Sequence, residues 1–546
     1  MSERLAKSAG TVGLAVMISR ILGLVRDQVM AAFFGTGMAH DAFNIAMRVP
    51  SLVRDLFAEG AMSAAFIPTF TRYWKEHGQA AAWRLGNLVL NALMVVTGTL
   101  VIAGMIFAEP LLSLLPKEFS GSGGQDLLTL TVTLTRVVLP FLLLVAVAVA
   151  LSGMLNSLRR FFVPAMSPAI YNVGVIFSAI TIIPVCNALG WNPIFGIAIG
   201  TLIGGLGQIV FQLPLLRREG FRYEPVLSFR DPGLREILLL MGPGTLGLAA
   251  SQVNLIVNTY LAVGEGEGAV TALQLAFRLM YLPIGLFGVS VATAAIPEIT
   301  RQVNAGALGD VRRTVSSSIR MMLTLSVPAT IGLMALSGPI VELIFERGQF
   351  TTESTRMTAL ALLCYAPGLI GYSAVKIASP TFYALKDARI PVLVSVSTIA
   401  LNLVLNLALV RVLGFQGLAL GTAIAALFNS GVLMYLLSRR IDGVEGGRVM
   451  VSFVKLLVAS LAMGAAAVVT EAWLDATLPP LDHLVAWLPG DVMAANARTL
   501  RTGVRVGAAI GVGLAILALA ATALRLHELT SVRTRIMARL RRTKEQ

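Results

Sequence analysis

The sequence predicts an all-α polytopic membrane protein with fourteen transmembrane helices: two six-helix lobes, related by a pseudo-two-fold axis along the membrane normal, plus two extra C-terminal helices. Of its 546 residues, 56% are hydrophobic and 13% are charged, whereas an ordinary soluble domain is roughly 25% charged. The mean hydropathy is +0.79, and single soluble cores stop growing near ~250 to 300 residues. Fourteen apolar stretches and an internal repeat give the helix number and the lobes.

Each predicted span is a stretch of about 20 mostly apolar residues, the length that crosses a bilayer as a helix. In chain order the spans are 9–34, 41–72, 86–115, 127–155, 163–188, 193–216, 236–263, 268–300, 314–345, 357–384, 390–413, 416–437, 449–473 and 502–525. The N-terminal apolar run continues without a small-residue cleavage site, so we expect it to stay as the first span.

The placement of basic residues predicts the orientation in the membrane. The N-terminus, the alternate loops and the C-terminal tail together hold 26 Lys and Arg. The opposite loops hold far fewer, chiefly Lys117, Arg347, Arg356, Arg411 and Arg498. Because cytoplasmic loops are enriched in Lys and Arg, both termini are expected to be cytoplasmic. The formal charge of +14 is thereby explained as a topology and lipid-surface signal, and nucleic acid is not an expected partner.

An internal repeat becomes visible when the chain is shifted by 230 residues, because nine of the 27 positions from 39 to 65 are then identical to positions 269 to 295. Ordered pairs such as Arg48/Arg278 are poorly explained by chance. Six spans separate the copies, so both have the same orientation, an arrangement typical of transporters. We therefore expect an N-lobe at 1–220, a C-lobe at 221–440, and spans thirteen and fourteen with a basic tail at 441–546.

Charged residues gather in the first two predicted spans, where each costs about 2.5 to 3.5 kcal/mol on insertion scales. Steps of seven place three of them within about 40° of one another on an ideal helix. Four cations face four anions here, so mutual pairing is one interpretation; the residues are Arg20, Arg26, Asp27, Asp41, Arg48, Arg54, Asp55 and Glu59.

Further cations point to an anionic substrate. Arg136, Arg278 and Lys376 lie within other spans and have no acid in the middle of their own span, which leaves an expected excess of about three positive charges in a cavity. Arginine suits bidentate phosphate binding, so we predict an anionic, phosphate-bearing headgroup. The chain has no phosphate-binding loop of the GK[ST] type and no His cluster, so neither an internal ATPase nor a metal site is expected.

Several segments give the chain a strong resemblance to a known family. At SRILGLVRD, GMAHDAF, RVPSLVRDLFAEGAMSAAFIP and AFRLMYLPIGLFGVSVATAAIP it resembles the MurJ/MviN family of lipid II flippases in the MOP exporter superfamily, and the similarity extends over essentially the whole chain. The resemblance implies transport of the undecaprenyl-pyrophosphate-linked peptidoglycan precursor from the cytoplasmic to the periplasmic leaflet of the bacterial inner membrane, by alternating access. It also implies membrane lipids and cell-wall synthesis proteins as partners.

The resemblance assigns roles to individual residues. The essential cavity arginines of the family look like Arg20, Arg26, Arg54 and Arg278. Asp41 matches a functional acid of the family, Glu59 occupies the acid position of FAEG, and the charge pattern adds Arg48 to the expected substrate-binding set. The last two spans resemble those that form the family's groove for the polyprenyl tail.

This sequence departs from the family at two places. In the eighth span Phe277 precedes Arg278 and Tyr281 follows it, where relatives often carry an Asp and a Glu. Some relatives bind sodium through acids, whereas the matching positions here look like amides. The weak sodium candidates are Asn258, Asn402, Asn406 and Thr422. Without carboxylates such a site should be weak, and packing of Asn between spans is the simpler interpretation. We therefore expect no cofactor, and membrane potential as the driving force, with sodium left open.

Two other function classes stay open. One is another MOP-type exporter, for lipid-linked oligosaccharides or for drugs, although a cationic cavity disfavours cationic drugs. The other is a membrane-embedded enzyme of cell-wall lipid metabolism. The outer loops at 116–126 and 474–500 contain no compact acid or Ser/His arrangement that would support such chemistry, so we expect a transporter and not an enzyme.

Overall fold

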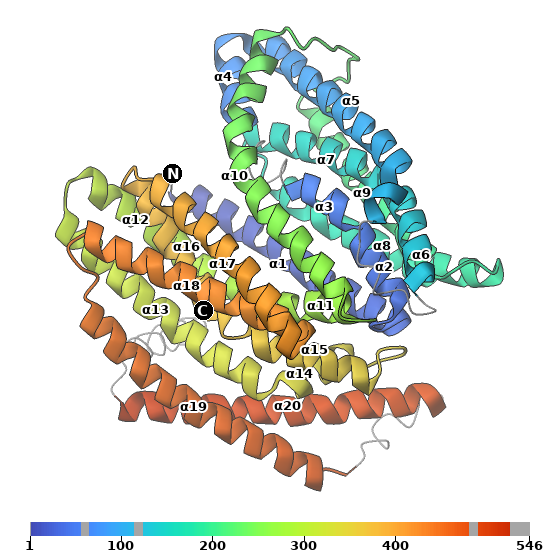
Figure 1. Cartoon of the computed structure of the whole chain (residues 1–546). Helices are drawn as coiled ribbons and strands as arrows, with labels where there is room; N and C mark the ends of the chain where they lie inside the picture. Colours follow the sequence, from blue (N-terminus) through green and yellow to red (C-terminus); the bar gives the residue numbers. More distant parts are fainter. Residues whose placement is uncertain (1, 56–64, 114–123, 480–489, 525–546) are drawn as a thin grey trace. The chain divides into compact units, whose positions relative to one another are not determined.

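The computed structural model describes residues 2–55, 65–113, 124–479 and 490–524. Every regular element within these ranges is a helix (Figure 1). The helices are α1 (Ser2–Phe34), α2 (Met38–Ala46), α3 (Arg48–Asp55), α4 (Ile67–Glu76), α5 (Gly78–Leu112), α6 (Gly124–Val138), α7 (Pro140–Ser157), α8 (Phe162–Ala188), α9 (Ile194–Arg218), α10 (Pro232–Val263), α11 (Ala269–Pro283), the π-helix η3 (Ile284–Gly288), α12 (Val289–Asn304), α13 (Leu308–Ala335), α14 (Ser337–Phe345), α15 (Thr352–Tyr365), α16 (Gly368–Ala384), α17 (Arg389–Leu413), α18 (Phe415–Arg440), α19 (Gly446–Thr477) and α20 (Gly490–Ala523).

The helices agree with the predicted membrane class. Nine helices or helix pairs in the described ranges are long and apolar enough to cross a membrane, and ten if the bent pair α15–α16 is one span. Helices also occupy the positions of the other four predicted spans, in α1, α2–α4, α10 and α11–α12. The chain is therefore an all-α multi-pass membrane protein, and the number fourteen stays a prediction.

Several predicted spans are broken helices, and proline lies at three of the breaks. Pro140 begins α7 directly after α6, and Pro283 ends α11 before the π-helix η3. Pro367 lies between α15 and α16, whose axes differ by 45°. Proline lacks the N–H that would continue the backbone ladder, and such freed backbone groups are tolerated in a membrane only where protein or a cavity surrounds them.

The chain divides into two compact units, Met1–Thr271 and Ala272–Gln546. The first unit contains α1 to α10, and the second contains η3 and α12 to α20, with α11 crossing the boundary. By this division α19 and α20 belong to the second unit. The lobe limits expected from the repeat stay a prediction, because they rest on sequence similarity and not on compactness.

In the first unit, α8 and α9 pack backbone against backbone. A Cβ at Gly174 would lie 2.6 Å from the Cα of Gly204, and a Cβ at Gly204 would lie 2.7 Å from the carbonyl oxygen of Tyr171. Gly196, Gly200 and Gly204 repeat every four residues along α9, which places them on one face of the helix. Such small-residue stripes let membrane helices approach closely, so the spacing of α8 and α9 is fixed by glycine.

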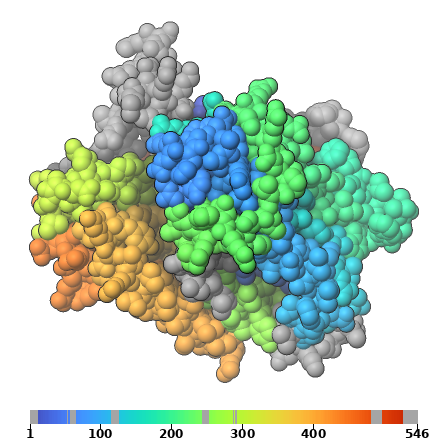
Figure 2. All heavy atoms as spheres, turned by 90° about the horizontal axis from the view of Figure 1, so that it is seen from above, coloured from blue at the N-terminus to red at the C-terminus, as the bar shows by residue number. Residues whose placement is uncertain are grey.

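The connection between α9 and α10 is fastened to α5. Asn87 donates to the carbonyl of Arg222 at 2.9 Å, and Asn91 donates to the carbonyls of Glu224 and Val226, each at 2.8 Å. Figure 2 shows this side of the first unit, where blue residues of the α4–α5 region lie beside green residues of the α9–α10 region. A loop that would otherwise leave its carbonyls to solvent is thereby held against a helix.

In the second unit, α13, α16 and α18 surround an apolar core with α12 and α19. Its fully buried members include Val311, Val327, Ile377 and Phe382, each 0% exposed. The helices α17 and α18 pack together, as do α19 and α20. The apolar outer faces of α17 and α19, with residues such as Val412 at 80% and Val469 at 68% exposure, are the surfaces that a membrane protein presents to hydrocarbon.

Candidate functional site

A cavity of about 480 Å³ lies inside the first unit. Its walls come from α1, α3, α4, α7, α8 and α9, and most of them are apolar. The polar side chains on the walls are Arg54, Asp55, Ser152, Asn156, Ser167, Tyr171 and Gln208. A mostly apolar pocket with a few convergent polar groups is the usual form of a ligand site.

Arg54 lies on the wall of this cavity at the end of α3, paired with its neighbour Asp55. The guanidinium donates from Nε at 3.0 Å and from Nη2 at 2.9 Å to the same carboxylate oxygen, Oδ1. The side chains of Arg54 and Asp55 are 42% and 32% exposed. Because Asp55 occupies only the Nε and Nη2 edge, the Nη1 edge of Arg54 has donors left for a second anion.

Arg26 reaches the same cavity through Tyr171. Its guanidinium donates to Oδ1 of Asp27, at 2.9 Å from Nη2, and its Cζ lies 5.6 Å from the centre of the Tyr171 ring. The Arg26 side chain is 14% exposed, and Tyr171 is one of the lining residues. The aromatic face attracts the cation, so Tyr171 connects the arginine on α1 to the cavity.

The other expected site residues of this unit lie elsewhere. Arg20 is exposed on α1 and is not part of the cavity wall. Arg48 is half-buried at the first residue of α3. Glu59 falls outside the described residues. Asp41 and Asp55, which an ideal helix places near one another, have different partners: Asp41 accepts from Gly268 and Thr271, whereas Asp55 is paired with Arg54.

Arg136 does not add to the excess of positive charge that the sequence predicts. Its Nη2 lies 3.6 Å from Oε2 of Glu109 on α5, and its Nε donates to the carbonyl of Met105 at 3.2 Å. The expected excess was too large because it considered only acids within the same span. The counter-charge comes from the neighbouring helix.

Asp41 is 1% exposed and binds the start of α11. One carboxylate oxygen accepts from the backbone N–H of Gly268 at 2.6 Å, and the other accepts from the N–H and the hydroxyl of Thr271, at 2.8 and 2.6 Å. Gly268 has a φ of +87°, and an added Cβ would lie 2.6 Å from the carbonyl oxygen of Thr36. Only glycine fits this turn without strain.

The arrangement is a helix cap whose carboxylate comes from another helix. The first N–H groups of a helix lack internal partners, and an anion at that end also meets the positive end of the helix dipole. Asn44 adds a bond to the Thr271 hydroxyl at 3.0 Å, and Glu267 accepts from the backbone N–H of Met38 at 2.7 Å. Asp41 thus joins the first turn of α2 to the first turn of α11.

Four uncharged polar side chains form a chain of hydrogen bonds behind the cavity wall. Ser152 donates to Gln212 at 2.8 Å, Gln212 donates to Ser167 at 3.2 Å, and Ser167 donates to Gln208 at 3.2 Å. The sequence analysis did not identify these residues. The signal was available, because Gln208 and Gln212 are amides four residues apart in an otherwise apolar span.

In the second unit, Arg278 lies half-buried on α11, six residues before the start of the π-helix η3. Its neighbours in sequence, Phe277 and Tyr281, stack with ring centres 5.8 Å apart. Tyr365 and Tyr372 complete this aromatic cluster, with ring centres 5.4 Å from Phe277 and 6.2 Å from Tyr281. Aromatic rings therefore occupy the places where relatives were expected to carry acids.

Three of the sodium candidates lie together between α17 and α18. Asn406 donates to Asn402 at 3.2 Å, and Asn402 donates to Thr422 at 3.4 Å. Both asparagines are almost fully buried, at 2% and 0% exposure. Their contacts join neighbouring helices, which is the packing role that the sequence allowed. Asn258 lies on α10, in the first unit.

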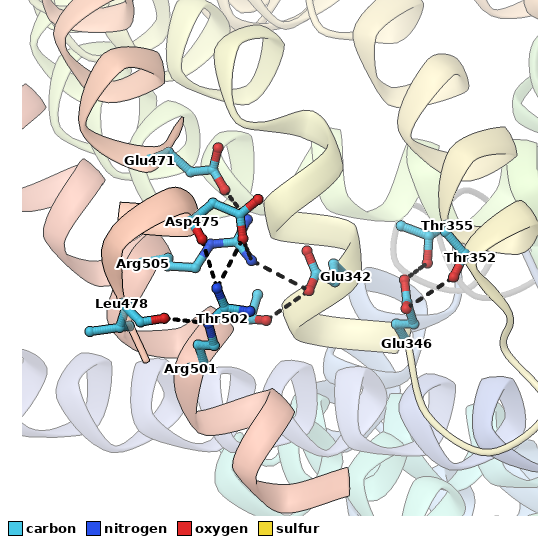
Figure 3. A network of polar contacts seen from close by, with 10 residues as sticks. All are labelled: Glu342, Glu346, Thr352, Thr355, Glu471, Asp475, Leu478, Arg501, Thr502 and Arg505. Carbon is cyan, nitrogen blue, oxygen red and sulfur yellow. Dashed lines mark hydrogen bonds and ion pairs between the residues drawn. The ribbon is translucent and has the colours of Figure 1, made fainter. Parts of the chain in front are cut away.

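The helices α19 and α20 are joined to α14 by an ionic network (Figure 3). Arg505 on α20 is paired with Glu471 and, at 2.9 Å, with Asp475 of α19, and its Nη1 lies 4.0 Å from Glu342 of α14. Thr502 donates to Glu342 at 2.7 Å. The Arg505 side chain is 10% exposed, so the network holds three helices together at one buried cation.

Comparison with known proteins identifies the family. The model of the family described as lipid II flippase MurJ matches residues 30–484. The probable lipid II flippase MurJ of Vibrio cholerae serotype O1 is 34% identical, over 95% of this chain and 97% of its own. That of Rhizobium meliloti is 33% identical, over 92% of this chain and 94% of its own.

Solved structures show the same fold. A lipid II flippase MurJ in an inward closed conformation superposes with a TM-score of 0.72 at 24% identity, covering 94% of this chain and 99% of that one. An inward-facing MATE family multidrug resistance transporter of the MOP superfamily gives a TM-score of 0.67 at 14% identity, covering 78% and 94%. Taken with the family model and the relatives, these findings place the chain: it belongs to the lipid II flippase MurJ family.

Proposed function

We propose that this chain flips lipid II, the undecaprenyl-pyrophosphate-linked disaccharide-pentapeptide, from the cytoplasmic to the periplasmic leaflet of the inner membrane. Family membership supports the proposal, and one observation in the structure carries it: a cavity of about 480 Å³ among membrane helices has Arg54 on its wall and Arg26 behind Tyr171. The chain acts as a transporter and not as an enzyme, because moving the lipid headgroup requires binding and release without bond cleavage.

The arginines bind the pyrophosphate. Arg54 uses its Nη1 edge while Asp55 holds the other edge in place, and Arg26 is oriented in the same way by Asp27. Pairing with a neighbouring acid keeps each guanidinium ordered before the substrate arrives, which lowers the entropic cost of binding. Substrate contacts of Arg20, Arg48, Arg278 and Glu59 remain predictions from the sequence.

Asp41 holds the chain in one conformation of an alternating-access cycle. Its carboxylate ties the first turn of α2 to the first turn of α11 through three hydrogen bonds. All three bonds must break when these two helix ends separate, so Asp41 acts as a latch on the outer side. Its effect on transport is therefore conformational, whereas the arginines act by contacting the substrate.

The membrane potential drives transport, and sodium is not strictly required. The amides of Asn402 and Asn406 bond each other, and amide oxygens are weaker ligands for sodium than carboxylates. Both termini lie in the cytoplasm, in keeping with the distribution of Lys and Arg.

The helices α19 and α20 receive the polyprenyl tail. Apart from the network at Arg505, their outward faces are apolar, with Val469 68% and Leu519 64% exposed. Truncation after Arg448 tests this role: if the shortened chain still reaches the membrane, it should lose flipping of long-chain lipid II and keep flipping of a short-chain analogue. Equal flipping of both lipids would contradict it.

The second candidate function is export of drugs by the mechanism of the MATE-type fold neighbours. The cavity wall disfavours it, because a site for cationic drugs needs unpaired carboxylates, and Asp55, the one carboxylate among the described wall residues, is paired with Arg54.

Depletion of the protein in growing cells tests the main proposal. Lipid II should accumulate in the cytoplasmic leaflet, where an added external lytic enzyme cannot reach it. Normal delivery of lipid II to the outer leaflet in depleted cells, with no second flippase expressed, would refute the proposal.

A further inference from the structure

The polar chain behind the cavity fixes the orientation of one amide. Gln212 donates from Nε2 to the carbonyls of Ala148 at 3.2 Å and Gln208 at 3.1 Å. Because a carbonyl oxygen can only accept, this nitrogen is the donor end of Gln212. Its Oε1 therefore accepts the bond from Ser152.

The same logic passes along the chain to Gln208. The Ser167 hydroxyl, 3.2 Å from Nε2 of Gln212, donates to Oε1 of Gln208 at 3.2 Å. Nε2 of Gln208 is then the end of the chain, and no hydrogen bond joins it to another described residue. Gln208 is 7% exposed and lies on the cavity wall, so its two N–H groups are available to a ligand or water in the cavity.

The charge of the wall indicates which kind of ligand would pair with it. Among the described residues that line the cavity, Arg54 and Asp55 are the only ionised ones, and they neutralise each other. The wall formed by α7, α8 and α9 supplies hydroxyl and amide groups instead. Such a surface suits an uncharged group with carbonyl acceptors better than it suits a phosphate.

We infer that Gln208 is a specificity-determining residue that donates to an amide carbonyl of the substrate headgroup, beside the pyrophosphate contact of Arg54. The inference rests on the proposed function, since it assumes that the headgroup enters this cavity. An amide carbonyl of this kind occurs in the N-acylated sugars and in the peptide of the headgroup. The hydrogen bond from Ser167 to Oε1 holds the amide of Gln208 in the donating orientation.

The experiment compares three lipids on the purified full-length chain: undecaprenyl pyrophosphate, the same lipid with the disaccharide, and lipid II. The unmodified chain should bind undecaprenyl pyrophosphate more weakly than at least one of the others. Gln208→Glu keeps the acceptor for Ser167 but replaces the donor, and Gln208→Met removes both. Gln208→Met should lower affinity for the acceptor-bearing lipids roughly tenfold, which corresponds to about 1.4 kcal/mol, and leave undecaprenyl pyrophosphate binding unchanged. Gln208→Glu should lose the same preference, and its added negative charge should also weaken binding of the pyrophosphate in all three lipids.

Two further variants serve as controls. Ser152→Ala breaks the far end of the chain and keeps the Gln208 donor, so it should preserve the preference. Arg54→Ala should weaken binding of all three lipids. If the Gln208 variants lose affinity for the disaccharide lipid as well as for lipid II, the carbonyl belongs to the sugars. If they lose affinity for lipid II alone, the carbonyl belongs to the peptide.

Three results would overturn the inference. Gln208 variants that keep the full preference would exclude donation from this residue, as would equal binding of all three lipids by the unmodified chain. Loss of the preference in Ser152→Ala to the same extent as in Gln208→Glu would indicate a purely structural role. If the unmodified chain binds no pyrophosphate lipid, the proposed function itself fails, and that failure is distinct from the others.

Discussion

Replacing Asp41 tests the latch most directly. In Asp41→Ala, the N–H groups of Gly268 and Thr271 lose their acceptor in a position where Asp41 is 1% exposed. A buried donor left unpaired costs about 1 to 3 kcal/mol, so the pair should cost about 2 to 6 kcal/mol. The thermal midpoint in detergent should fall, and flipping should fall with it, because the conformation that the latch holds becomes less populated.

Asp41→Asn makes the test sharper, because the side chain keeps its shape. One end of the amide can still accept, but the other places an N–H group against an N–H group of α11, either at Gly268 or at Thr271. This variant should therefore lose about half the stability that Asp41→Ala loses.

Thr271 provides the matched controls. Thr271→Ser keeps the hydroxyl that donates to Asp41 and should behave like the unmodified chain. Thr271→Val removes that hydroxyl, which donates to Asp41 and accepts from Asn44, and should cost about 1 to 3 kcal/mol. An Asp41→Ala variant with an unchanged midpoint and full flipping activity would refute the reasoning, since three buried hydrogen bonds would then contribute nothing.

Four further outcomes follow from the structure. Arg54→Ala should abolish flipping while the folded protein stays in the membrane, and Arg54→Lys should keep only part of the flipping activity because lysine lacks the planar fork. Complementation assays measure both variants, and full activity of Arg54→Ala would show that Arg54 is not part of the site. Arg505→Met should destabilise the chain by about 2 to 4 kcal/mol in thermal unfolding. This is somewhat below the usual cost of breaking a buried ion pair, because the partner Asp475 is 53% exposed. The control Arg501→Met should cost less, because the Arg501 side chain is already 31% exposed. Flipping in sodium-free medium at constant membrane potential should persist, and loss of most activity would point to an ion site at the buried asparagines. A hydrogen bond from Ser316, with Arg448 and Arg320 nearby, lowers the pKa of Glu445 below its ordinary value of 4.5. The ionised Glu445 therefore stabilises the fold above pH 4.5, and this stabilisation is lost as the pH falls through the pKa of the folded state. The thermal midpoint of Glu445→Gln should be lower than that of the unmodified chain at pH 7 and should depend less on pH.

The fold was largely predictable from the sequence, because in a membrane the length and polarity of a segment nearly decide its structure. The predicted spans at 163–188 and 193–216, for example, coincide closely with α8 (Phe162–Ala188) and α9 (Ile194–Arg218). The break at Met47 could not be predicted by the same means. Hydropathy averages over a window, and it does not register a local irregularity such as the one that separates α2 from α3.

The sequence predicted charged residues of the candidate site, but it did not predict which residues form ion pairs with them. The sequence identified Arg54 as an intramembrane cation, and the structure locates it on a cavity wall. Which acid pairs with which arginine depends on neighbouring helices, as Arg136 and Glu109 illustrate. The repeat contained one unused indication: Asp41 and Thr271 are equivalent positions at the offset of 230, and they bond each other directly. Of these two equivalent positions, one now holds an acceptor, Asp41, and the other a donor, Thr271, so the two residues attract each other.

The glycine contacts between α8 and α9 determine how this protein can evolve. Gly204 lies one turn before Gln208, and the carbonyl that it touches belongs to Tyr171, so the backbone contact and the cavity wall are parts of one surface. A methyl group at Gly204 would meet the backbone of Tyr171 as well as its ring, so it would push the helices apart and displace the amide and the aromatic ring together. Substitutions at half-buried wall positions such as Asn156 leave that spacing intact. New headgroup preferences are therefore accessible through the lining side chains, whereas the width of the cavity is nearly fixed for the lineage.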